Sequence, residues 1–122
     1  GNEDVVVVTL NYRLGIFGFM PTSTDGTGGM NGILDQVQAL EWVHQYISFF
    51  GGNPNQITIF GESAGAKSVG ILSVLPQANG LFHRAIVESG YYNFHLIGAD
   101  ISMQTVKMVL DEIDCSEPPC TV

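Results

Sequence analysis

The chain has 122 residues, of which 45% are hydrophobic and 13% are charged, and its formal net charge is −8 at pH 7. This composition excludes a disordered chain, because it supplies enough apolar surface for a core. The negative charge argues against nucleic acid or an anionic membrane surface as a partner. No apolar run approaches the roughly 20 residues that a membrane-spanning helix needs. The length fits one small domain.

A strand and a helix are the first predicted elements. Residues 5–10 form a continuous apolar, β-branched run without alternation, which predicts a strand covered on both faces. The segment with glycines and phenylalanines that follows the strand ends at Pro21. Residues 22–32 have the composition of a surface loop. A helix is predicted from about Ile33 to Phe49, because apolar side chains recur at helical spacing. The stripe expected to face the core is Ile33, Val37, Leu40, His44 and Ile47.

The rest of the chain is organised around residues 57–75. The apolar strand predicted at 57–60 leads into Gly61-Glu62-Ser63-Ala64-Gly65, and a helical run follows that Pro76 stops. A GxSxG turn between a strand and a helix is the sequence signature of a nucleophile elbow. In such a turn the backbone of the serine is strained, and its hydroxyl projects above the sheet. We expect this turn to require glycine at positions 61 and 65, because side chains at Gly61 and Gly65 would collide.

The start of the helix after Ser63 is expected to stabilise negative charge beside the serine hydroxyl. Its unpaired N–H groups and the positive end of its dipole are directed at the serine. The N–H of Ala64 is therefore predicted to be one donor of an oxyanion hole. Glu62 could be a helix N-terminal carboxylate favoured by the dipole. Because it adjoins Ser63 within the motif, we favour an active-site role.

The remaining elements complete an α/β pattern. A further strand is predicted at 85–89, before Gly90, and an amphipathic helix from about Ser102 to Ile113. Strands that alternate with helices predict parallel pairing through right-handed crossovers. Three such strands leave apolar edges unpaired, so we expect them to be the middle of a larger sheet.

The cysteines and histidines carry weaker signals. Cys115 and Cys120 enclose four residues, and they either close a small disulfide loop in an oxidising compartment or remain reduced thiols. His44, on the apolar stripe, is interpreted as a core or boundary residue. His83, which precedes a strand, and His95, in a loop, are also interpreted as non-catalytic, because a lone histidine signals function weakly.

The residues around Ser63 resemble the active-site signature of the type-B carboxylesterase and cholinesterase family of α/β-hydrolases. The matching residues are 50–54, 57–60 and 61–65, with Glu62 directly before the serine. Three further stretches are similar to the family: residues 11–15 with 17–19, 34–36 with 42–43, and 81–86 with 89–90. The resemblance covers about Val5 to Cys120. It identifies residues 1–122 as an internal portion of a single α/β-hydrolase catalytic domain that is several times longer.

The resemblance implies a serine hydrolase of carboxylic esters that forms an acyl-enzyme on Ser63. It implies that the N–H of Ala64 is an oxyanion donor and that Glu62 stabilises positive charge beside the site. Ser89 resembles a serine that lies under the catalytic histidine. The acid and the histidine of the triad, and a Gly-rich loop that completes the oxyanion hole, are expected outside residues 1–122. We therefore expect no useful activity from this segment alone.

Further positions match structural features of the family. Arg13 and Asp35 match a buried ion pair, and independently each needs a partner, because the arginine lies in an apolar strand segment and the aspartate in an apolar helix. Cys115 matches the start of a disulfide loop, although the loop closed by Cys120 is shorter than usual. The resemblance implies a small-molecule ester substrate, with no metal or organic cofactor. With the cysteine loop, it suggests a secreted, cell-surface or endoplasmic-reticulum protein. Residues 91–96 depart from the family pattern, so acyl specificity is not transferred.

Two alternatives from other functional classes remain. Residues 61–68 read GESAGAKS, one residue away from the GxxxxGK[ST] phosphate-binding loop of nucleotide-binding proteins. Ala66 stands where that loop needs a glycine, and Glu62 would place a carboxylate in the phosphate cradle. The second alternative is a non-catalytic adhesion or scaffold protein on the same fold, which the missing triad partners allow.

Overall fold

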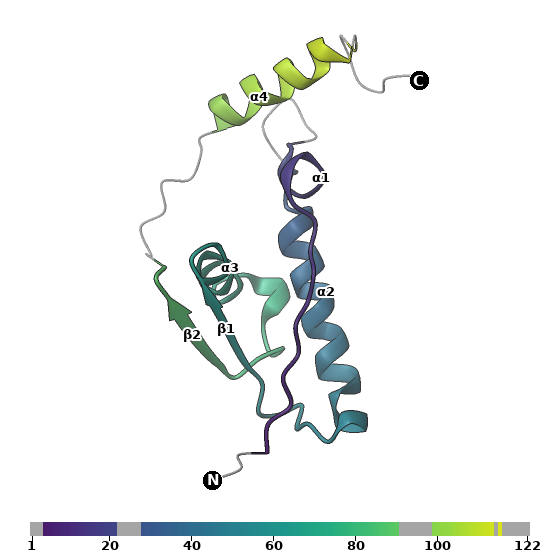
Figure 1. Ribbon diagram of the computed structural model, residues 1–122, viewed down its shortest axis with the longest axis vertical. Coiled ribbons are helices and arrows are strands. Elements are labelled where there is room, and N and C mark those ends of the chain that lie inside the picture. Colours follow the sequence, from purple (N-terminus) through teal and green to yellow (C-terminus); the bar gives the residue numbers. More distant parts are fainter. Residues whose placement is uncertain (1–3, 22–27, 91–98, 114, 116–122) are drawn as a thin grey trace. The chain divides into compact units, whose positions relative to one another are not determined.

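The computed structural model describes residues 4–21, 28–90, 99–113 and 115 (Figure 1). Contacts divide the chain into two compact units, residues 1–12 with 33–94 and residues 13–32 with 95–122. The first unit contains a small sheet, its covering helices and Ser63. Among its described residues, the second contains two helices.

Two parallel strands form the sheet of the first unit. β1 (Thr58–Glu62) pairs with β2 (Arg84–Glu88), in a register that joins Thr58 to Arg84 and Glu62 to Glu88. Between them lie α3 (Ala64–Leu72) and the short 3₁₀-helix η2 (Pro76–Ala78). The predicted strand–helix–strand unit with parallel pairing is confirmed. Because the strands are parallel and in register, both end at the same edge of the sheet.

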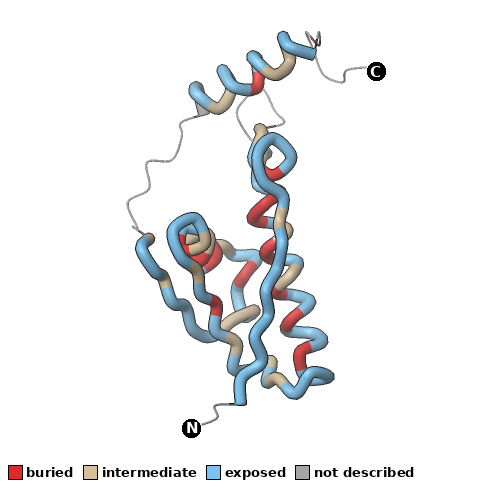
Figure 2. Tube along the Cα trace, in the orientation of Figure 1, coloured by how far each residue is buried: buried red, intermediate tan, exposed pale blue. Residues whose placement is uncertain are grey.

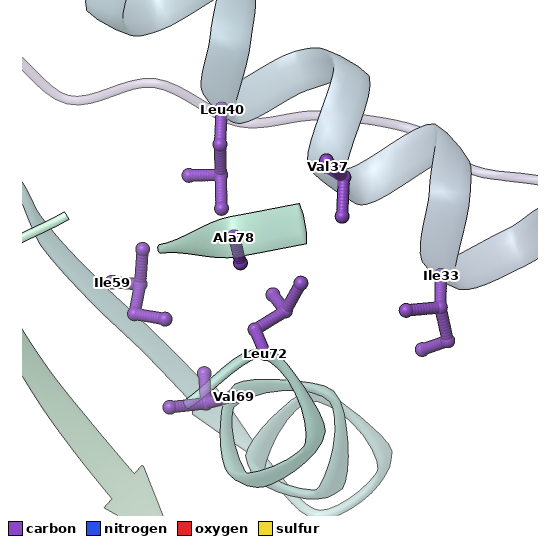
Figure 3. Close-up of a cluster of buried hydrophobic side chains, with 7 residues drawn as sticks. All are labelled: Ile33, Val37, Leu40, Ile59, Val69, Leu72 and Ala78. Carbon is purple, nitrogen blue, oxygen red and sulfur yellow. The ribbon is translucent and has the colours of Figure 1, made fainter. Parts of the chain in front are cut away.

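The core of this unit lies on one face of the sheet. α2 (Asn31–Tyr46), which the 3₁₀-helix η1 (Ile47–Phe50) extends, packs its apolar side against β1 and α3. Burial follows these facing sides of the elements (Figure 2). The buried side chains of this cluster converge from the helices and the strand (Figure 3): Ile33, Val37, Leu40, Ile59, Val69, Leu72 and Ala78. The apolar spacing of α2 therefore predicts three of these seven residues, Ile33, Val37 and Leu40.

The opposite face of the sheet is apolar and open among the described residues. Phe60 and Ile86 are register partners, and they are 63% and 50% exposed. Parallel sheets are ordinarily covered on both faces. Within the described residues this face has no covering layer, and the expectation that β1 and β2 belong to a larger sheet stays a prediction.

The predicted strand at residues 5–10 is wrong for this structure. The segment forms no strand, and Val5 and Val7 are 73% and 67% exposed. It borders a cavity of about 740 Å³ whose other lining residues include Ile59 and Val69. A strand with two apolar faces needs hydrogen-bond partners and two covering layers, and the first unit does not provide them to this run.

Two details of the predicted helices also need correction. His44 is exposed, whereas Val43 is buried, because the buried stripe of α2 continues from Leu40 through Val43 to Ile47. α3 ends at Leu72, not at Leu75, and Pro76 begins η2 instead of stopping α3 directly. Proline fits there because the first helical position needs no N–H donor.

The second unit contains α1 (Gly15–Phe19) and α4 (Ala99–Glu112). The sequence predicts α4 to within a turn but does not predict α1, which is only five residues long. The side-chain amide of Asn31 donates a hydrogen bond to the carbonyl of Phe17 at 3.3 Å.

Cys115 is buried after α4, and its N–H donates to the carbonyl of Leu110 at 2.8 Å. Cys120 and most of the loop predicted at 22–32 lie outside the described residues, so the disulfide stays a prediction. None of the helices that the structure describes has the length and apolarity to cross a membrane.

Replacing Val69 by alanine is expected to lower the free energy of unfolding by about 2 kcal/mol, because it removes buried apolar groups and leaves a cavity. Val69 is 4% exposed within the core cluster. Val74 is 82% exposed, so its replacement by alanine should change stability by less than about 0.5 kcal/mol. Urea denaturation measures both variants. Equal losses from the two substitutions would show that the cluster around α3 is not the core.

Candidate active site

β1 leads directly into α3 (Figure 1). Ser63 is the single residue between them. Its backbone has φ 52° and ψ −110°, and its residue surface is exposed. A positive φ is sterically unfavourable for a residue with a Cβ atom. Among the described residues other than glycine, only Ser89 shares this feature, with φ 55°. The strained turn that the GxSxG pattern predicts is therefore present.

The hydroxyl of Ser63 is not used to cap α3. Serine at the N-cap position ordinarily accepts a hydrogen bond from the first turn, with its backbone in the extended region. Ser63 occupies the N-cap position but makes no side-chain cap hydrogen bond. Its positive φ takes the residue out of the extended conformation in which serine caps a helix. The hydroxyl thus remains available to another partner at the surface.

Backbone hydrogen bonds hold Ser63 from both sides. Its N–H donates to the carbonyl of Glu88 in β2 at 3.0 Å. Its carbonyl accepts from the N–H of Lys67, in the first turn of α3, at 3.1 Å. A strained conformation persists only where surrounding structure enforces it. Here the sheet and the helix together enforce the conformation of Ser63.

The two glycines of the motif differ in their structural roles. A Cβ atom on Gly61 would lie 2.5 Å from the carbonyl oxygen of Gly65 and closer still to its carbonyl carbon. A Cβ atom on Gly65 would meet nothing within 4 Å. The expected collision is therefore correct at Gly61 and wrong at Gly65. The two glycines differ because the end of β1 approaches the backbone of Gly65. It does not approach the side of Gly65 where a Cβ atom would point.

The end of β2 lies beside the end of β1. Glu62 and Glu88 are the last register partners, so Ser63 and Ser89 follow them at the same level of the sheet. Gly90 comes so close to α3 that a Cβ atom there would lie 2.5 Å from the Cβ of Ala66. Ala66 is fully buried, at 0% exposure. The close contact between Gly90 and Ala66 fixes the first turn of α3 against the end of β2.

Glu62 and Ala64 flank the serine as expected. Glu62 is the exposed last residue of β1, and Ala64 is the exposed first residue of α3. The first residue of a helix has no intrahelical acceptor for its N–H. The N–H of Ala64 therefore has the position that an oxyanion donor needs, at the positive end of the helix dipole. The chemical roles of Glu62, Ala64 and Ser89 stay predictions.

His83 has a structural contact far from Ser63. The ring Nδ1 of His83 accepts a hydrogen bond from the backbone N–H of Ile57 at 3.3 Å. The backbone N–H of His83 donates to the carbonyl of Ile57 at 2.8 Å. Ile57 precedes β1, so His83 lies at the opposite end of the strands from Ser63. This supports the prediction that His83 is not catalytic. His44 is exposed on α2, and His95 lies outside the described residues.

The predicted ion pair between Arg13 and Asp35 stays a prediction. Arg13 is exposed and Asp35 is half-buried, and the two residues belong to different compact units.

No group of three or more metal-ligating side chains occurs within the ranges that the structure covers. The geometry does not support a phosphate-binding loop at residues 61–68, because Ser63 alone separates strand from helix and leaves no loop to surround a phosphate.

Sequence reasoning missed one polar residue near the site, Gln36. It is 4% exposed in α2, and its Nε2 donates a hydrogen bond to the Oγ of Ser68 in α3 at 3.1 Å. The signal in the sequence is an amide at helical spacing from Ile33 and Leu40, in an otherwise apolar stripe. That signal indicates a buried polar contact but does not identify the partner.

The substitution Gly61→Ala is expected to lower the free energy of unfolding by about 2–3 kcal/mol, because its Cβ atom would overlap the backbone of Gly65. The matched substitution Gly65→Ala meets open space in the first turn of α3, where alanine is favoured over glycine by about 0.4–1 kcal/mol because it restricts the unfolded chain. It should therefore leave stability unchanged or raise it. Thermal unfolding of both variants checks the difference, and a Gly61→Ala variant as stable as Gly65→Ala would contradict the geometry.

Comparisons with known proteins agree with this arrangement. The chain matches the model of the carboxylesterase family over residues 1–121. It is 60% identical to carboxylesterase 5A of Felis catus over 88 residues, which are 72% of this chain and 16% of that protein. It is 58% identical to the cocaine esterase of Homo sapiens over 88 residues, again 72% of this chain and 16% of that protein. The chain thus spans about one sixth of the length of these relatives.

Solved structures show the same local architecture. The carboxylesterase EST55 of Geobacillus stearothermophilus matches with a TM-score of 0.79 and 43% identity, over 89% of this chain and 24% of that one. The juvenile hormone esterase of Manduca sexta matches with a TM-score of 0.80 and 35% identity, over 89% and 21%. The family model matches nearly every residue, including the turn at Ser63. The chain belongs to the carboxylesterase family.

Proposed function

We propose that the protein is a serine hydrolase of carboxylic esters, with Ser63 as its nucleophile. The observation that carries this proposal is the exposed Ser63 in a strained turn, with a hydroxyl that does not cap the helix behind it. Membership of the carboxylesterase family supports the same reaction class. A scaffold protein on this fold has no need for a strained serine at the surface, so we favour the enzyme.

In the complete protein, Ser63 Oγ attacks the carbonyl carbon of the ester while a histidine accepts the hydroxyl proton. The tetrahedral intermediate carries a negative oxygen, which accepts hydrogen bonds from the N–H of Ala64 and from further N–H groups upstream. Collapse of the intermediate breaks the bond to the alcohol, which leaves with the proton. Water then attacks the acyl-enzyme by the same route and releases the acid. The histidine and its acid come from outside residues 1–122.

Two features of the described residues favour this chemistry. The first turn of α3 places its dipole behind the developing negative charge. The carboxylate of Glu62, exposed at the end of β1, stabilises positive charge that forms on the histidine or is carried by the substrate. Two relatives are called cocaine esterase and acylcarnitine hydrolase. We propose neutral or cationic small-molecule esters as the substrate class for this protein.

The substitution Ser63→Ala should abolish ester hydrolysis in the full-length protein, with a fall in kcat of about 10⁴-fold or more, because it removes the nucleophile. A fluorophosphonate probe should form a covalent adduct on Ser63, which peptide mass spectrometry locates. Ser48→Ala, at an exposed serine in η1, is the matched control and should retain activity and labelling. Turnover of p-nitrophenyl acetate that survives in Ser63→Ala, or labelling at another residue, would contradict the proposal.

A further inference from the structure

Gln36 is the buried polar side chain among the residues that the structure describes, with 4% of its surface exposed. Its Nε2 donates a hydrogen bond to the Oγ of Ser68 at 3.1 Å. The Oγ of Ser68 in turn donates to the carbonyl oxygen of Ala64 at 3.2 Å. Two successive hydrogen bonds therefore connect the middle of α2 to the first residue of α3. That residue carries the N–H to which we assign oxyanion binding.

Packing alone does not explain an amide at position 36. Within the described part of the chain, Oε1 of Gln36 is buried and has no hydrogen-bond partner. A buried acceptor without a partner carries a desolvation cost. A methionine would occupy the same space without that cost. The amide of Gln36 thus has one satisfied contact in the core, its bond to Ser68.

The bond from Gln36 orients the hydroxyl of Ser68. A serine hydroxyl has one proton to donate and lone pairs that accept. Since Nε2 of Gln36 occupies a lone pair, the proton of Ser68 is directed to the carbonyl of Ala64. Hydrogen bonds in such a chain also polarise and strengthen each other.

The Ala64 carbonyl belongs to the peptide group that follows the Ala64 Cα, and the Ala64 N–H belongs to the peptide group that precedes it. A hydrogen bond that holds the carbonyl therefore limits rotation about the backbone bonds of this Cα. From the other side, Ser63 is held by its bonds to Glu88 and Lys67. With both neighbours of the Ala64 Cα restrained, the direction of the Ala64 N–H is set before substrate arrives. Oxyanion donors stabilise the transition state only when they are aligned with the developing charge, and small displacements cost much of the effect.

We propose that Gln36 and Ser68 are positioning residues for the oxyanion hole, acting on the Ala64 N–H through the hydrogen-bond chain from α2 to α3. The proposal rests on the proposed function, since it assigns a purpose to that N–H. It predicts that breaking the chain weakens stabilisation of the tetrahedral intermediate and leaves the binding of uncharged substrate largely intact.

The structure offers a matched control for each residue. Ser73, at the other end of α3, donates the same kind of bond, from Oγ to the carbonyl of Val69 at 2.8 Å. Gln38 lies two positions from Gln36 in α2, but it is exposed and donates to Glu41 at 3.1 Å. Ser73→Ala and Gln38→Met therefore repeat the two chemical changes away from Ala64.

The test compares Gln36→Met and Ser68→Ala with these controls in the full-length protein. Titration with a fluorophosphonate gives the concentration of competent Ser63, so that kcat is expressed per reactive site. We expect kcat for p-nitrophenyl acetate to fall roughly 3- to 30-fold in both variants, with KM changed less than about twofold. Ser68→Thr keeps the hydroxyl and should restore kcat. The controls should match the wild type.

A second measurement separates positioning from general loss of structure. A trifluoromethyl ketone adds reversibly to the serine, and the resulting hemiketal oxygen is an anion that needs the Ala64 N–H. Its inhibition constant should rise by the same factor as kcat falls. A kcat per reactive site that stays at the wild-type value in Gln36→Met and Ser68→Ala would overturn the inference, as would a loss confined to stability or to the number of reactive sites. A wild-type protein that the fluorophosphonate does not label at Ser63 would instead overturn the proposed function, and the inference with it.

Discussion

The hydrogen bond from the N–H of Ser63 to the carbonyl of Glu88 is the interaction on which the site depends. It extends the pairing of β1 and β2 by one residue, at the point where the chain already turns into α3. A serine held by both the sheet and the helix keeps a positive φ that it would not adopt by itself. That conformation takes the hydroxyl away from helix capping and leaves it exposed.

Packing beneath the turn determines where the first turn of α3 lies. The helix is anchored by Val69 and Leu72 in the core, and Ala66 lies fully buried against Gly90 at the end of β2. Small residues at these close contacts allow the helix backbone to approach both strand ends. The donor geometry at Ala64 therefore depends on the core, and the bond between Gln36 and Ser68 adds a polar connection from α2. Stability and chemistry use the same contacts here.

The sequence predicts the parts of this arrangement that depend on local pattern. The apolar strand before GxSxG, the helix after it and the strained Ser63 follow from residues within one short stretch, and the steric need for Gly61 does too. Other features depend on distant contacts. The run at 5–10 has the composition of a buried strand but lacks the partner layers that would make it one. The partner of Gln36 lies 32 residues away in the sequence, and the tolerance at Gly65 depends on which side of the helix faces β1. Helical periodicity does not supply this information.

The most direct measurement is a crystal structure of the full-length protein after reaction with an organophosphonate. We predict phosphorus bonded to the Oγ of Ser63, with φ of Ser63 still positive and the phosphoryl oxygen within hydrogen-bond distance of the Ala64 N–H. An adduct whose oxygen points away from the start of α3, or a Ser63 with an extended backbone and an interior side chain, would contradict it.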